Sequence, residues 1–106
     1  MQKYIIITLL ALLTLTSCGE YQRAQKSTDA NYKLDFAKRA FEKKRYVQAA
    51  TILQDVITVF KGTEKAEESL YLLALSNYEN KDYTTAGAYF KTYYTRYPRG
   101  KYTELA

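Results

Sequence analysis

The sequence contains no histidine and no tryptophan, and it has one cysteine, one proline and four glycines among 106 residues. Without histidine, the side chain most often used as a general base and as a zinc ligand is missing. No glycine-rich loop follows a strand-like segment. Glu64, Glu67 and Glu68 lie at a predicted helix start, where negative charge complements the helix dipole. We therefore expect no catalytic residues, no metal site and no cofactor, and we predict that the protein is not an enzyme.

Charge of one sign is not gathered into a long block. The 16 basic and 11 acidic residues give a formal net charge of +5, and the two signs are mixed along the chain. A mixed pattern is typical of a solvated surface, whereas nucleic-acid-binding proteins concentrate their basic residues. We expect no nucleic-acid partner, and no sequence feature indicates a small-molecule substrate.

The single cysteine follows a short apolar segment at the start of the chain, "MQKYIIITLLALLTLTSC". Lys3 is followed by an apolar run that is shorter than the roughly 20 residues needed to span a bilayer, which is typical of a secretory signal peptide. The ending Leu15-Thr16-Ser17-Cys18 resembles the lipobox of bacterial lipoproteins. We predict a signal peptide over residues 1–17 and lipidation of Cys18. The alternative is a buried free cysteine behind an uncleaved anchor.

Lipidation explains why a cysteine stands at this position. A thiol is the best side-chain nucleophile for forming a thioether to diacylglycerol, and the new amino group can carry a further acyl chain such as palmitate. Several acyl chains hold a protein far more firmly than one. The stretch 19–30 has little apolar periodicity, so we predict that residues 18–30 are the lipidated cysteine and a polar tether. Glu20 is not the aspartate associated with inner-membrane retention, which favours the outer membrane.

Two later stretches, "RYVQAATILQDVITVF" (45–60) and "DYTTAGAYFKTYYTRY" (82–97), align with a shift of 37 residues. The aligned pairs keep their apolar or aromatic character, for example Ala49 with Ala86 and Val56 with Tyr93. In each stretch these residues recur with helical spacing, and a second helical stretch precedes each one. Few residues here break helices. The sequence predicts four helices, over residues 30–44, 45–60, 64–80 and 82–97.

Each unit of the repeat is a helix, a short turn and a second helix, which predicts an antiparallel helix pair. Gly62 and Thr63 provide a helix stop and an N-cap, and Pro98 with Gly100 end the fourth helix. With alanine at fixed positions and a closing proline, the unit resembles the tetratricopeptide repeat (TPR). We therefore predict an all-α, TPR-like α-solenoid over residues 31–106. Its repeats are 31–62 and 63–99, and a third begins at 100–106.

A lipobox, a polar tether and long repeats containing "AEESLYLLALSNYENKDYTTAGAYFKTYYTRYP" together resemble the BamD-type outer-membrane assembly lipoproteins, in particular their Bacteroidetes branch. The resemblance implies a lipid-anchored scaffold of the β-barrel assembly (BAM) complex that faces the periplasm from the outer membrane. It implies two partners, a BamA-like barrel subunit and unfolded outer-membrane proteins.

In TPR-like arrays the first helix of each pair lines the concave face. Residues there that packing does not require form the candidate peptide-binding groove: Leu34, Lys38, Phe41, Tyr71, Leu75 and Tyr78. Aromatic anchors with few charges suit an apolar or aromatic peptide. The alternative is that these residues pack against neighbouring repeats or simply lie at the surface.

Other classes stay open at the level of sequence. A TPR coordinator of the Tol division system has similar repeats, although the lipobox argues against it. A nutrient-uptake lipoprotein would need a longer chain and a carbohydrate site. The ending "GKYTELA" resembles the start of another repeat, so we expect a longer protein, and an enzyme domain beyond residue 106 is a further alternative.

Overall fold

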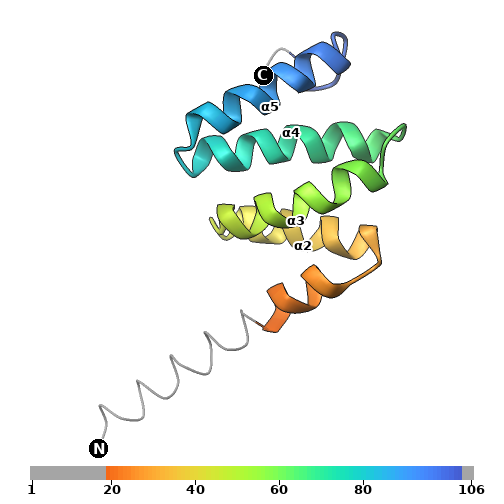
Figure 1. The fold of residues 1–106 in the computed structure, drawn as a ribbon, viewed down its shortest axis with the longest axis vertical. Helices are drawn as coiled ribbons and strands as arrows, with labels where there is room; N and C mark the ends of the chain where they lie inside the picture. Colours follow the sequence, from red (N-terminus) through yellow and green to blue (C-terminus); the bar gives the residue numbers. More distant parts are fainter. Residues whose placement is uncertain (1–18, 104–106) are drawn as a thin grey trace, which may run out of the picture.

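The computed structural model describes residues 19–103, which form an array of antiparallel helices (Figure 1). A first helical segment spans residues 19–26. It is followed by α2 (Ala30–Glu42), α3 (Tyr46–Val59), α4 (Glu64–Glu79) and α5 (Tyr83–Arg96). Each one packs against the next along the chain. The observed bounds lie within two residues of the predicted ones. The all-α, TPR-like fold of adjacent helix pairs is therefore confirmed.

Small residues lie where the helices cross. Ala37, Ala49 and Ala74 are fully buried, and Ala86 is almost so. An alanine at a crossing lets two helix backbones approach closely, and the larger Ile52, Leu53 and Leu73 fill the space beside it. The equivalent alanines of the two repeats therefore serve the same packing purpose, as the aligned sequences predict.

The apolar stripes, meaning the apolar and aromatic residues that recur with helical spacing in α3 and in α5, are not equally covered by neighbouring helices. In α3 the stripe is buried at Ile52 and Leu53, because α2 lies on one side of this helix and α4 on the other. In α5 the equivalent Tyr89 and Phe90 are only partly buried. Within the described part of the chain, α4 is the only helix packed against α5. The outer face of α5 is therefore aromatic and half open to solvent.

The turn inside each helix pair has the same backbone in both repeats. Lys44 and Lys81, 37 residues apart, have positive φ angles of 63° and 66°. The amide of the next residue donates back across the helix end, from Arg45 to the Ala40 carbonyl at 2.8 Å and from Asp82 to the Asn77 carbonyl at 2.9 Å. This pattern satisfies the last carbonyls of α2 and α4. The repeat is thus present in the backbone as well as in the sequence.

The turn between the pairs differs in one detail from the prediction. Gly62 has a φ of 87° and lets the chain leave α3. Thr63 occupies the N-cap position of α4, but its hydroxyl does not cap the helix. Instead it donates to the carbonyl of Phe60 at 2.7 Å, so it stabilises the end of α3.

The predicted tether is wrong over residues 19–26, which are helical. Ala24 is fully buried in the core, and the Tyr21 ring lies 6.1 Å from the Phe36 ring of α2. The two contact residues are three positions apart, which places them on one helix face. A face this short gave no clear periodicity in the sequence. The predicted signal peptide, residues 1–17, and the predicted lipidation site, Cys18, lie outside the described residues. No helix within 19–103 is long and apolar enough to cross a membrane.

Candidate binding pocket on the first helices

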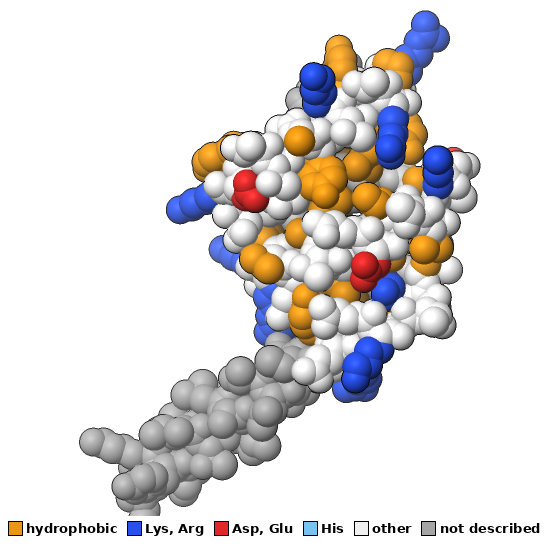
Figure 2. Space-filling view, in the orientation of Figure 1, with side chains coloured by type: hydrophobic (Ala, Val, Ile, Leu, Met, Phe, Trp, Pro, Cys, Tyr) orange, Lys and Arg blue, Asp and Glu red, His pale blue; other side chains and the backbone are white. Residues whose placement is uncertain are grey.

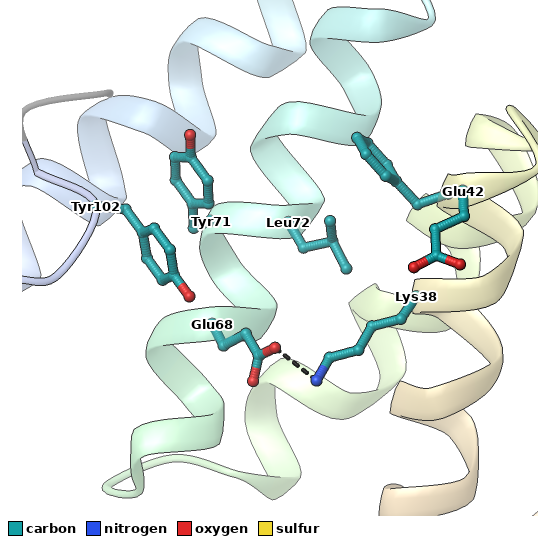
Figure 3. A pocket seen from close by; sticks show the side chains of 7 residues that line it. Lys38, Glu42, Glu68, Tyr71, Leu72 and Tyr102 are labelled. Atoms are coloured by element: carbon teal, nitrogen blue, oxygen red, sulfur yellow. Dashed lines mark ion pairs between the residues drawn. The ribbon is translucent and has the colours of Figure 1, made fainter.

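A cavity of about 270 Å³ opens between α2, α4 and the segment after α5 (Figure 3). Its lining combines aromatic, aliphatic and charged side chains: Lys38, Phe41, Glu42, Glu68, Tyr71, Leu72 and Tyr102. Two of the contributing segments are the first helices of the two repeats, and Tyr102 lies in the turn after α5. The volume falls just below the roughly 300–1,000 Å³ of small-molecule sites, which fits one or two side chains of a peptide better than a cofactor.

Tyr71 is the centre of an aromatic cluster that forms one wall. Its ring stacks on Tyr102 with centroids 4.4 Å apart and planes 7° apart, and it lies 5.6 Å from the Tyr93 ring. Burial raises the pKa of the Tyr71 phenol, and the neighbouring Tyr102 adds to the rise. The phenol is therefore neutral at physiological pH. The wall offers flat apolar surface with hydroxyl groups at its edge, a combination common at protein interfaces.

An ion pair joins the two repeats at the rim. Lys38 Nζ of α2 lies 2.6 Å from Glu68 Oε1 of α4, as Figure 3 shows. The two side chains are 42% and 36% exposed, so water screens the pair and its contribution to stability is at most about 1 kcal/mol. Its position matters more than its energy, because the pair places charge beside an apolar cavity.

A hydrogen-bonded clamp holds Tyr102 in place. One carboxylate oxygen of Glu67 accepts from the Tyr93 hydroxyl at 2.8 Å and from the Lys101 amide at 2.7 Å. The Tyr93 hydroxyl in turn accepts from the Tyr102 amide at 2.9 Å. A Cβ at Gly100 would lie 2.6 Å from the same Glu67 oxygen, so only glycine permits this approach. Glu67 therefore does more than complement the helix dipole.

The structure brings together three of the six predicted groove residues, Lys38, Phe41 and Tyr71. Leu34 is only 3% exposed and belongs to the core, so it is not available to a ligand. Leu75 is partly buried and does not line the cavity. Tyr78 is half exposed beyond the cavity, in edge contact with Tyr83.

Four lining residues were missed from the sequence: Glu42, Glu68, Leu72 and Tyr102. The 37-residue shift aligns Tyr102 with Lys65, which does not line the cavity, so the repeat gave no signal for Tyr102. Glu68 was assigned to the helix dipole alone, and helical spacing gave no reason to connect it with Lys38. Among residues 19–103, no three potential metal-ligating side chains lie close enough together to hold an ion.

Paired antiparallel helices whose first members share an aromatic-lined pocket define a TPR-like helical-repeat protein. A family model, YfiO, described as outer membrane lipoprotein, matches residues 24–106. The chain therefore belongs to this family of outer membrane lipoproteins. Searches of curated proteins and of solved structures find no match.

Proposed function

We propose that the protein is a lipid-anchored scaffold of the outer-membrane β-barrel assembly complex, which binds unfolded outer-membrane proteins and helps insert them together with a BamA-like subunit. The observation that carries the proposal is the family match over residues 24–106. The lipobox ending at Cys18 supports the anchor, and the BamD-type resemblance supplies the assembly role. The protein acts by binding, without catalysis of its own.

The pocket is the proposed contact with the client. Unfolded barrel strands carry aromatic and aliphatic side chains at alternating positions, and one such side chain fits against Phe41, Tyr71 and Leu72. Burying one large apolar side chain contributes about 1.5–3 kcal/mol. A contact of that strength is weak, which suits a scaffold that must pass its client on.

Co-purification tests the function. The full-length gene is expressed with an affinity tag, and the proteins recovered from outer-membrane extracts are identified. We expect a BamA-like barrel subunit among them. Recovery of Tol components or of a nutrient transporter without that subunit would contradict the assembly role, and would favour another protein-interaction lipoprotein of the cell envelope.

A further inference from the structure

The turn between α2 and α3 carries a dense cluster of positive charge. Lys43, Lys44 and Arg45 are consecutive and exposed, and Arg39 lies one helical turn earlier, also exposed. Among residues 19–103, ion pairs form at Lys33 and Lys38, and none involves these four side chains. We call Arg39, Lys43, Lys44 and Arg45 the basic turn.

The basic turn lies beside the start of the described chain. A small hollow is lined by Glu20 together with Arg39, Lys43 and Arg45. Glu20 is two residues from Cys18 in the sequence. Because residues 19–26 pack on the body instead of forming a free tether, a lipid on Cys18 would hold the first repeat close to the bilayer. Figure 1 shows the α2–α3 turn at one edge of the array, and Figure 2 shows Lys and Arg side chains along that edge as well as elsewhere on the same face.

The second repeat shows that the fold does not need this charge. The positions equivalent to 43–45 hold Asn80, Lys81 and Asp82, which carry no net charge. The turn nonetheless has the same left-handed residue and the same hydrogen bonds. At this turn, the excess of positive charge is therefore present in the first repeat and not in the second.

Arg45 takes the place of a better helix cap. Asp82, its equivalent, accepts a hydrogen bond from the Thr85 amide at 3.2 Å and caps α5. Arg45 makes no side-chain cap for α3, and its positive charge opposes the dipole at a helix start. Arg39 and Lys43 lie at the end of α2, where the helix dipole favours positive charge. The dipole does not account for the positive charge of Arg45, which lies at the start of α3. Arg45 therefore stabilises the start of α3 less than a capping aspartate would.

We propose that the basic turn binds the phosphate headgroups of anionic phospholipids in the membrane that carries the anchor. Lysine and arginine near a bilayer are attracted by anionic lipid, and guanidinium groups bind phosphate oxygens bidentately. Val47, the second residue of α3, is 60% exposed and adds an apolar group near the basic turn. The inference rests on the lipid anchor of the proposed function, and it orients the repeats with the α2–α3 turn toward the bilayer.

The test uses the lipidated full-length protein reconstituted into vesicles of phosphatidylethanolamine and phosphatidylglycerol. Val47→Cys places a fluorophore near the basic turn, and Val59→Cys is the matched control, because both valines are exposed on α3 at opposite ends. Quenching by spin-labelled headgroups is measured. We expect quenching at position 47 to be several-fold greater than at position 59. Raising the salt from about 0.1 M to about 1 M shortens the Debye length from about 10 Å to about 3 Å. This should at least halve the difference in quenching between positions 47 and 59.

Two controls separate the possible failures. Cys18 is the only thiol among the 106 residues, so label found on the peptide that contains Cys18 of the unsubstituted protein would show that Cys18 is not lipidated, and would overturn the anchor and the inference together. With the anchor intact, equal quenching at positions 47 and 59 would overturn the proposal that the basic turn binds anionic lipid, and would leave the anchor standing. Unchanged quenching at position 47 when phosphatidylcholine replaces phosphatidylglycerol would do the same. Arg45→Asp should reduce quenching at position 47 while its melting temperature stays equal or rises, because aspartate caps α3.

Discussion

At the scale of single residues, the least expected feature is a tyrosine in the core. Tyr93 is fully buried at the position where the first repeat has Val56. The aligned stripes predicted a core residue there, which is confirmed. They could not show where the hydroxyl group finds partners, because Glu67 lies in another helix and the Tyr102 amide lies in the turn after α5. Helical periodicity carries no information about such contacts.

Replacing Tyr93 with phenylalanine tests this clamp. The change removes one donated and one accepted hydrogen bond but keeps the ring, so we expect the free energy of unfolding to fall by about 1–2 kcal/mol. Urea denaturation measures the change. Tyr94→Phe is the control, since Tyr94 is 58% exposed, and it should change stability by less than about 0.5 kcal/mol. Equal effects of the two substitutions would refute the clamp.

Alkaline pH should weaken the fold through the same residue. Burial raises the pKa of the Tyr93 phenol, so its neutral form is favoured in the folded state. The stabilisation is fully present below the unfolded pKa of about 10 and is lost as the pH rises through the folded pKa, at no more than about 1.4 kcal/mol per pH unit. Denaturation between pH 8 and about 11 measures this slope. Tyr93→Phe should flatten it, and an unchanged slope would show that other groups cause the loss.

At the scale of helices and turns, sequence reasoning was most successful where a pattern was repeated. The second copy of each stripe located the helix ends, and the 37-residue shift located equivalent turns. The helix at residues 19–26 was missed because it has no second copy and only Tyr21 and Ala24 mark its packed face. Such a short amphipathic face is visible only when the helix it packs on is known.

The left-handed turn residues give a prediction at this scale. Lys81 has a φ of 66°, a conformation that glycine adopts with much less strain. We expect Lys81→Gly to raise the free energy of unfolding by about 0.5–1 kcal/mol, and Lys44→Gly to do the same. Chemical denaturation measures both. Gln54→Gly, at an exposed position inside α3, should instead lower it by about 1 kcal/mol, and a loss at all three positions would contradict the assigned turn geometry.

At the scale of the whole molecule, the pocket exists because successive first helices lie side by side. Lys38 and Phe41 of α2, Tyr71 of α4 and Tyr102 after α5 are far apart in the sequence and meet on one face. The first three are among the groove residues that the sequence predicts, and their role in binding stays a prediction. The sequence placed Leu34 on the same face, because Leu34 shares a helical stripe with Lys38 and Phe41. In the structure Leu34 is buried, and residue spacing alone does not show which positions a neighbouring helix covers.

Two features of the described chain, one helix and one side chain, bear on how the array is oriented. The helix over residues 19–26 packs on the body, so these residues do not form a free tether. Arg45, which stands where the second repeat has a capping aspartate, adds positive charge to the nearby α2–α3 turn. Together with the proposed anchor, these features lead us to propose that the first repeat lies against the membrane. The pocket lies between the first and second repeats.

Site-specific photo-crosslinking in cells tests most directly whether the pocket receives unfolded outer-membrane proteins. A photoreactive amino acid replaces Phe41 in the pocket of the full-length protein, and Val59, 65% exposed on α3 and absent from the pocket lining, is the control position. We predict crosslinks from position 41 to newly exported barrel proteins, increasing when barrel assembly is slowed, and none from position 59. Crosslinks that are absent at position 41, or equally strong at both positions, would contradict the account.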